Sequence, residues 1–526
     1  MALFPRGGGS PLVGFGLSRG AAFALAVLGG ALQALSLAPL PLGGLQVVAL
    51  ALLVAVLPGA SVRRGAALGL AFGFAWMLGT FFWLFVSMHR YGHLPAALAG
   101  VAVAALAAAM ALYPAAGAAA FAAWAPASRW RAVVLWALLW LAGELARAQW
   151  LTGFPWGAAG YAQVDSLLAV LAPWLGVYGM GAAAAALAAW SALQALEARG
   201  ARRLWALAPA LALTLLPAWR GPDFTMPTTR LSVTLLQGNV PQDEKFDYTR
   251  LPATLAWHAR ALTAARSDLV VAPETAIPLL PEQLPQGFWD RLTAHFAAGR
   301  SHALVGMPLG DLGAGYTNSV VGLAPAVGNR PGEYRYDKHH LVPFGEFIPP
   351  GFRWFVDAMR IPLGDFSRGP RAAPSFPVNG EWVAPNICYE DLFGEELAAR
   401  WNGEHPAPTL LANVSNIGWF GETVAVDQHL HISRLRSLEL QRPMLRATNT
   451  GATAVIDHRG QVTHRLAPYQ RGVLEGDVTG RSGTTPFAWW ASRLRLWPLW
   501  VLALAGIAWL AGPAMRRRRG RSSDQR

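Results

Sequence analysis

The 526-residue chain has few charged residues, and it lacks them altogether in several long stretches. Only 14% of its residues are Asp, Glu, Lys or Arg, against about 25% in a soluble globular protein. None occurs in residues 20–62, 65–88, 91–128 and 166–196. Because a helix needs about 20 apolar residues to cross a bilayer core, these gaps exclude a protein that is soluble throughout and predict a polytopic membrane domain.

The chain also has a single cysteine, Cys388. A lone cysteine excludes an internal disulfide. Taken alone, a cysteine at the end of an apolar strand is most often a small buried core residue. A catalytic role for Cys388 therefore needs support from the residues around it.

The uncharged stretches predict eight spans. Pro39 and Pro41 divide the first stretch in two, and a second apolar stretch follows so soon that a cleavable signal peptide is not expected. The expected spans are about 20–39, 43–60, 65–88, 94–124, 131–149, 166–195, 203–219 and 496–515.

The net charge of +13 lies almost entirely beside these spans. Fifteen arginines in short loops and tails, less the two negative charges of Glu197 and Asp524, account for this net charge. The arginines occur within residues 6–19, 63–64, 129–131, 199–203 and 516–526. Such loops are cytoplasmic by the positive-inside rule. This distribution argues against a nucleic-acid partner, and it predicts that the segment after Trp219 is outside the membrane and the C-terminal tail inside.

The fifth predicted span carries two charges, Glu144 and Arg147. Charges inside a membrane are costly, so they are functional candidates by default. The simpler interpretation is that both lie near the outer interface, where Arg147 extends to water.

From about residue 220 to 494 charges return and short β-rich runs alternate with helical ones. Helices are expected at 251–266 and 281–299. Several runs are continuously apolar, as in strands buried on both faces. Strands are expected at 231–239, 268–274, 303–308, 319–325, 382–390, 409–416 and 452–458. This order predicts an α/β or α-β-β-α sandwich. The expected domains are 1–219 (membrane, about seven spans), 220–494 (catalytic) and 495–526 (one span and a basic tail).

Three polar residues follow or end predicted strands: Glu274, Lys338 and Cys388. Acyl transfer through a covalent intermediate needs a thiolate nucleophile. A carboxylate can accept the thiol proton, and an ammonium group lowers the thiol pKa and stabilises the oxyanion. The main-chain amide of Tyr389 would complete an oxyanion hole. Each residue alone also has an ordinary structural interpretation, as core, cap or solvated loop residue.

The short sequence motifs around these residues resemble those of a known family. They are LLQGNVPQ, APETAIP, YDKHHLVPFGEFIP, NICYEDLF and NVSNIGWFG, in this order, with LTGFPWGAAGYAQ in the membrane part. Together they resemble the nitrilase superfamily, and more narrowly the apolipoprotein N-acyltransferases. The resemblance covers nearly the whole chain, and it implies N-terminal spans, a nitrilase-like domain and one C-terminal span.

The resemblance implies roles for individual residues. Cys388 is expected to be the nucleophile, Glu274 the general base and Lys338 the oxyanion-stabilising residue. Supporting positions also follow from the motifs: Glu346 as a second carboxylate, Tyr389 and Glu390 behind the nucleophile, and Trp419 on a mobile substrate-facing arm. Phe246 stands where the family commonly has tryptophan, so an aromatic lid is retained without an indole N–H.

The resemblance also implies the reaction. A fatty acyl group passes from the sn-1 position of a phospholipid to Cys388, and from there to the α-amine of a lipoprotein's N-terminal diacylglyceryl-cysteine. It implies a bacterial inner-membrane location with a periplasmic catalytic domain, no cofactor, and a monomer as the working expectation.

Three alternatives stay open on the residues alone. A membrane-tethered amidase or hydrolase would use the same residues with water as acceptor, and a transporter or scaffold would carry an inactive domain. A metal site on His339, His340, His429 and His431 is disfavoured by their spacing; ordinary solvated loop histidines are the expectation, and no metal.

The charge pattern yields a test of topology. A cysteine introduced at position 300 should react with a membrane-impermeant thiol reagent added outside the cell. A cysteine at position 520 should react only after the membrane has been permeabilised. The reverse labelling pattern would overturn the predicted orientation.

Overall fold

The computed structural model describes residues 17–523, apart from 40–41, 220, 312, 314, 328–329 and 354–365. The chain forms two compact units, each described here by itself. One contains Met1–Phe82, Gly100–Arg220 and Leu496–Arg526; the other contains Trp83–Ala99 and Gly221–Arg495.

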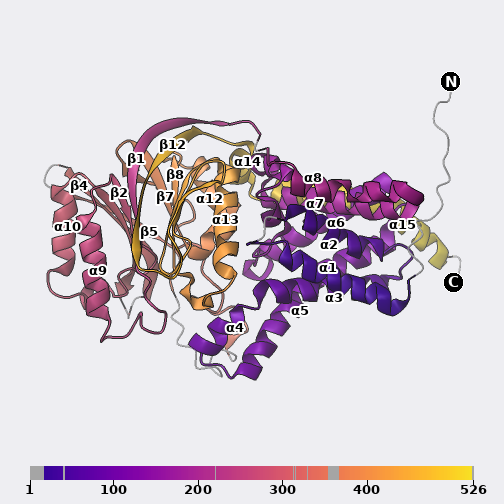
Figure 1. Ribbon diagram of the computed structural model, residues 1–526, viewed down its shortest axis with the longest axis horizontal. Coiled ribbons are helices and arrows are strands. Elements are labelled where there is room, and N and C mark those ends of the chain that lie inside the picture. The colour runs from indigo at the N-terminus through magenta and orange to yellow at the C-terminus, as the bar shows by residue number, and fades with distance from the viewer. Residues whose placement is uncertain are drawn as a thin grey trace. The chain divides into compact units, whose positions relative to one another are not determined.

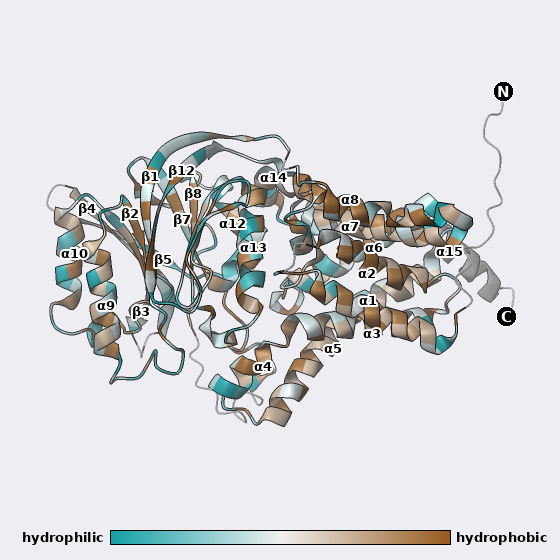
Figure 2. Ribbon diagram, viewed as in Figure 1, coloured by the Kyte–Doolittle hydropathy of each residue, from teal (hydrophilic) through white to brown (hydrophobic). Residues whose placement is uncertain are grey.

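The first unit is helical (Figure 1), and hydrophobic residues dominate its helices (Figure 2). A helix overlaps each of the eight predicted spans. Their bounds are α1 Arg19–Leu35, α2 Gly43–Ala55, α3 Val62–Phe81, α5 Ala96–Trp124, α6 Arg129–Gln149, α7 Ala172–Glu197, α8 Ala208–Leu215 and α15 Trp497–Ser523. A 3₁₀ helix, η5 (Gly200–Leu207), precedes the short α8. The predicted helical membrane domain is confirmed.

The number of spans stays a prediction. Among the described residues, three helical stretches are long and apolar enough to cross a membrane, or up to five if each of two bent pairs is one span. The three are Ala96–Trp124, Arg129–Thr152 and Leu167–Glu197. α1 and α2 are apolar but shorter, with 17 and 13 residues.

Small residues let these helices approach closely. At Gly30 of α1, an added Cβ would collide with the carbonyl oxygen of Phe72 in α3. Membrane helices associate largely through such close backbone packing, because lipid offers no hydrophobic driving force between them.

Glu144 and Arg147 of α6 hold an irregular loop inside the first unit. Arg147 donates hydrogen bonds to the carbonyl oxygens of Phe154 (2.7 Å) and Trp156 (2.8 Å). Glu144 Oε1 accepts one from the amide of Ala159 (2.8 Å) and lies 3.5 Å from Arg147 Nη2. Non-helical backbone in an apolar unit requires such internal partners.

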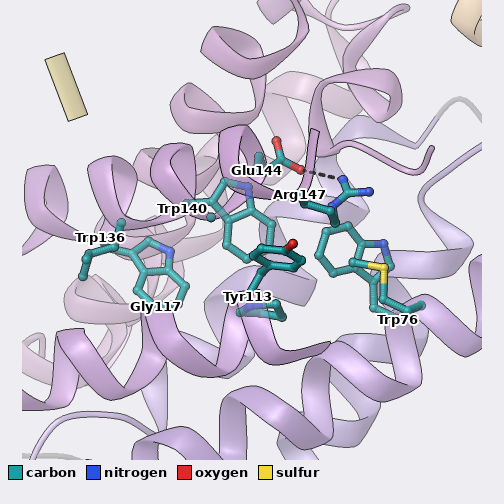
Figure 3. A pocket seen from close by; sticks show the side chains of 11 residues that line it. Trp76, Tyr113, Gly117, Trp136, Trp140, Glu144 and Arg147 are labelled. Atoms are coloured by element: carbon teal, nitrogen blue, oxygen red, sulfur yellow. Dashed lines mark hydrogen bonds and ion pairs between the residues drawn. The ribbon is translucent and has the colours of Figure 1, made fainter. Parts of the chain in front are cut away.

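The same pair lines a pocket between α3, α5 and α6. Trp76, Tyr113 and Trp140 project into this region beside the dashed Glu144–Arg147 contact (Figure 3). Arg147 and Glu144 are only 2% and 4% exposed. The expectation that Arg147 extends to an interface is therefore wrong, because its donors are used by two loop carbonyls and a carboxylate.

The second unit is a four-layered sandwich. One sheet has the order β12-β1-β2-β3-β4-β5 and the other β11-β10-β9-β8-β7-β6. The first sheet comprises β1 Thr225–Gln237, β2 Leu269–Val271, β3 His302–Asp311, β4 Gly315–Val327, β5 Arg330–Asp337 and β12 Gly472–Gly483. The second comprises β6 Phe376–Val378, β7 Glu381–Ile387, β8 Leu410–Ser415, β9 Met444–Thr448, β10 Ala454–Ile456 and β11 Val462–Arg465.

Apolar side chains from both sheets form the central layer, including Val233 and Val271 from one sheet and Ile387 and Val414 from the other. The helices α9 (Leu251–Ala264) and α10 (Phe288–Ala298) cover the first sheet, where their apolar faces form a second core. α13 (Ala425–Leu440) lies against the second sheet (Figure 1). The predicted α-β-β-α sandwich is confirmed.

Every predicted strand is present, with shifted ends. β5, β6, β9, β11 and β12 were not expected. β11 is polar and mostly exposed, and β12 is exposed at alternate positions along most of its length, so both lack the apolar run that marked the buried strands. The helix expected at 281–299 begins only at Phe288, because Pro281 and Pro285 precede it and proline removes backbone donors.

A short segment from the sequence between α3 and α5 belongs to the second unit. It contains the single turn α4 (Leu84–Val86) and the π-helical turn η1 (Ser87–Tyr91). Trp83 donates to Gln428 Oε1 (3.1 Å), and its ring lies 4.3 Å from that of Phe420. Indole burial with a satisfied N–H is a favourable anchor.

Replacing Arg147 tests its structural role. Arg147→Met leaves Glu144 and two loop carbonyl groups buried without their cation. Breaking a buried ion pair in this way lowers the free energy of unfolding by about 3–5 kcal/mol. A clear drop in thermal unfolding temperature in detergent is expected. Arg131→Met is the control, since Arg131 is exposed on the same helix; equal losses in both variants would contradict the assignment.

Candidate functional site

The predicted catalytic residues follow three strands whose carboxyl ends lie at one edge of the sandwich. Glu274 follows β2, Lys338 follows β5, and Cys388 follows β7. β7 runs parallel to β8, with Ile387 paired to Val414, so Cys388 and Ser415 end neighbouring strands. The carboxyl ends of parallel strands are where α/β sheets commonly place chemistry.

Glu274 stands in a tight turn that a glycine makes possible. An added Cβ at Gly306 of β3 would lie 2.8 Å from both the Cα of Glu274 and the nitrogen of Thr275. The Glu274 carboxylate is buried and accepts hydrogen bonds from Asn318 Nδ2 (2.7 Å) and the main-chain amide of Asn416 (2.7 Å). Both oxygens are thus oriented before a substrate arrives.

Lys338 lies between two carboxylates. Its Nζ is 2.8 Å from Glu346 Oε1 and 3.7 Å from Glu274 Oε1. Asn318 Nδ2 bridges the same two carboxylates, at 2.8 Å from Glu346. Burial alone would lower the pKa of Lys338, but the two carboxylates outweigh it and raise the pKa above the ordinary value. Lys338 therefore stays cationic although it is 1% exposed.

Cys388 begins the 3₁₀ turn η7 (Cys388–Leu392) with a φ of +52°. A non-glycine residue in this region is strained, and such strain clusters at functional sites. Burial and the neighbouring Glu274 raise the pKa of the Cys388 thiol to about 12, against the opposing effect of Lys338. The expected thiolate is thus a neutral thiol at rest, because desolvation exceeds the attraction of the ammonium group.

The Glu390 carboxylate links the chain at the carboxyl end of β5 to the chain at the carboxyl end of β7. It accepts hydrogen bonds from Tyr336 Oη (2.8 Å) and from the amides of His339 (2.7 Å) and Ile387 (2.7 Å). His339 follows Lys338, and Ile387 precedes Cys388. A buried carboxylate with this many donors is a strong constraint, so Glu390 sets the relative positions of the cation and the nucleophile.

A buried polar network supports the main chain of Cys388. Its carbonyl oxygen lies 3.2 Å from Asn413 Nδ2 and 3.3 Å from His429 Nε2. His429 also contacts Asp391 Oδ1 (2.9 Å) and Arg446 Nη2 (2.6 Å). Burial and Arg446 lower the pKa of His429.

The expectation that the four histidines are solvated loop residues is wrong for three of them: His431 lies on helix α13, and His429 and His340 are buried. His429 is 1% exposed on α13, and His340 is 8% exposed with its ring 3.6 Å from that of Phe393. Helix α13 gave no apolar signal, because half of its buried residues are polar. Within the described residues, no group of three or more His, Cys, Asp or Glu is arranged to hold a metal ion.

The aromatic residues of the prediction fall into two classes. Tyr389 is buried against His340 and Phe393, whereas Phe246 and Trp419 are 54% and 41% exposed. Trp419 packs edge-on against Tyr91, with ring centroids 5.8 Å apart. An exposed aromatic pair suits contact with a large apolar substrate, but the roles of these residues remain predictions.

The motif analysis missed Asn318, Asn413 and a second buried amine, Lys245, whose Nζ lies 3.0 Å from the carbonyl oxygen of Glu274. Lys245 lies beside the word LLQGNVPQ, so a signal was available. Asn413 begins the motif NVSNIGWFG, so a signal was available there as well. Asn318 carried none, because an asparagine in a strand does not reveal which side chains it joins.

Comparison with known proteins matches both parts of the chain. Residues 29–190 match the apolipoprotein N-acyltransferase N-terminal domain, and residues 232–487 match the carbon-nitrogen hydrolase model. The chain is 52% identical to the apolipoprotein N-acyltransferase of Verminephrobacter eiseniae, over 94% of this chain and 97% of that protein. It is 44% identical to the protein of the same name from Ralstonia nicotianae, over 94% of each chain.

Identity at this level extends across the helical unit and the sandwich together, in the order in which the motifs occur. The chain belongs to the apolipoprotein N-acyltransferase family.

Proposed function

We propose that this protein transfers a fatty acyl group from the sn-1 position of a phospholipid to the α-amine of a lipoprotein's N-terminal diacylglyceryl-cysteine. The observation that carries the proposal is the cluster of buried Glu274 and Lys338 with the partly buried Cys388, in a chain that also has long apolar helices. Lys338 and Glu274 are 3.7 Å apart, and both interact electrostatically with the Cys388 sulfur. Family membership favours acyl transfer over hydrolysis.

The first step is acylation of Cys388. Glu274 accepts the thiol proton while the sulfur attacks the ester carbonyl carbon, and the carbonyl oxygen becomes an oxyanion that Lys338 stabilises. The carbon–oxygen bond then breaks, and Glu274 returns the proton to the departing lysophospholipid oxygen. Because the resting thiol is neutral, the nucleophile forms only when substrate places an electrophilic carbon beside it.

The second step reverses these roles. The lipoprotein amine attacks the thioester carbon, Glu274 accepts a proton from the amine nitrogen, and the carbon–sulfur bond breaks to restore the thiol. Both substrates are lipid-anchored, and exposing an acyl chain to water costs about 0.8 kcal/mol per CH₂. A catalytic domain tethered at the membrane surface avoids this cost.

The location and organisation are parts of the same proposal. We infer an inner-membrane protein with residues 220–494 in the periplasm, about seven spans in 1–219 and one in 495–526, acting as a monomer. The apolar helices and the flanking arginines support this arrangement.

Cys388→Ser tests the nucleophile. Incubation with phosphatidylethanolamine should add a fatty-acyl mass to the Cys388 peptide of the wild type, removable by hydroxylamine, and none to the variant. A diacylated peptide should then discharge the wild-type thioester far faster than water does. Normal turnover by the serine variant would refute the assignment, and discharge by water alone would identify a hydrolase.

Lys338→Met tests oxyanion stabilisation. Acylation should slow by about 10²–10³-fold, the usual loss for one oxyanion donor, while thermal unfolding changes much less. Arg335→Met is the matched control, because Arg335 lies on β5, three residues before Lys338, with a half-exposed side chain. Acylation of the Lys338 variant at the control rate would remove the proposed role.

A further inference from the structure

Lysine is very rare in this chain, and both lysines lie at the candidate site. Of the 43 basic residues counted as Lys or Arg, only Lys245 and Lys338 are lysine. They are 3% and 1% exposed, and both contact Glu274. Wherever a cation is needed elsewhere, the chain uses arginine; at these two buried positions it uses the compact ammonium group.

Lys245 and its loop hold Glu274 at both ends. Lys245 Nζ donates to the Glu274 carbonyl oxygen (3.0 Å). Gln242 of the same loop accepts a hydrogen bond from Asn416 Nδ2 (2.7 Å), and the Asn416 amide donates to the Glu274 carboxylate (2.7 Å). These contacts form a closed ring from the loop to Glu274 and back.

The charges of the cluster explain why a second amine is useful. Glu274 and Glu346 are both buried, and Lys338 lies between them. One ammonium group balances only one carboxylate, and an uncompensated buried charge is costly. Within the described residues, Lys245 contacts a carbonyl oxygen and no carboxylate directly, so its charge acts on the cluster as a whole.

We propose that Lys245 is a second cationic positioning residue, whose ammonium group compensates the two buried carboxylates and reduces the cost of negative charge on the Cys388 sulfur. Its effect on turnover rests on the proposed function, whereas its effect on the thiol does not. As the proton moves from sulfur to Glu274, negative charge moves to the sulfur and then to the carbonyl oxygen. Lys245 and Lys338 together keep the cluster near neutrality during this movement.

The two amines differ in how they titrate. Burial lowers the pKa of Lys245 to about 8, although Glu274 and Cys388 act to raise it. Lys338 keeps a raised pKa. The groups whose negative charge acts on Lys245 are Glu274 and, once its sulfur is ionised, Cys388; Lys245 in turn lowers the pKa of buried His258. The stabilising charge of Lys245 is therefore present below about pH 8 and is lost as the pH rises through that value.

Direct titration tests this without any lipid. In the full-length protein labelled with ¹⁵Nζ-lysine, only two side-chain signals occur, and Lys245→Arg assigns them. One signal should titrate near pH 8 and the other should stay protonated to the alkaline limit of the fold. A Lys245 signal that already belongs to the neutral amine at pH 7 would overturn the proposal.

Alkylation of the single cysteine measures the effect on the sulfur. With iodoacetamide at pH 7, Lys245→Met should react about tenfold more slowly than the wild type, which corresponds to one pKa unit. Lys245→Arg keeps the charge and should react at or near the wild-type rate. The control is Arg471→Met, because Arg471 also holds this loop, through the Gly238 carbonyl (2.9 Å). Equal slowing in Lys245→Met and Arg471→Met would reduce Lys245 to a loop anchor.

Acyl-enzyme formation from phosphatidylethanolamine gives the final comparison. The wild-type rate should fall as the pH rises through about 8, and Lys245→Arg should lose this fall; an unchanged profile would contradict the role. Absence of acyl-enzyme in the wild type, with the alkylation differences intact, would instead refute only the proposed acyl transfer.

Discussion

The candidate site depends on one buried carboxylate, that of Glu274. A buried carboxylate is stable only where hydrogen bonds and cations replace water, and here Asn318, Asn416, Lys338 and Lys245 supply them. These residues come from both sheets and from two loops. The Glu274 carboxylate therefore keeps all these partners only if the two sheets of the sandwich pack in one fixed position relative to each other.

Cys388, the expected nucleophile, is also held in place by its surroundings. Cys388 has a positive φ, a neutral thiol at rest and a carbonyl held by Asn413 and His429. Glu390 fixes its strand to that of Lys338. Negative charge on the sulfur is thus disfavoured at rest. The surrounding network, rather than an acidic thiol, prepares the site.

Sequence patterns found the long apolar elements well and the polar ones poorly. Continuous apolar runs marked β1, β3 and β8 because both their faces are buried. Helix α13 and the loop after α6 escaped detection as buried structure, since their polar groups pair with each other inside the protein. Arg147 and His429 were placed at surfaces for this reason, and pairing across many residues leaves no local periodicity.

The sequence by itself determined the apolar helices and the sandwich class, and it marked Glu274, Lys338 and Cys388 as candidates for catalysis, because hydrophobic runs and short motifs are local properties of the chain. Only the tertiary structure decided that Lys245 joins Lys338 at Glu274, that Arg147 supports a loop, and that the resting sulfur is a thiol. Each of these depends on burial and on distances between residues far apart in sequence, and desolvation and Coulomb energies follow from those quantities alone.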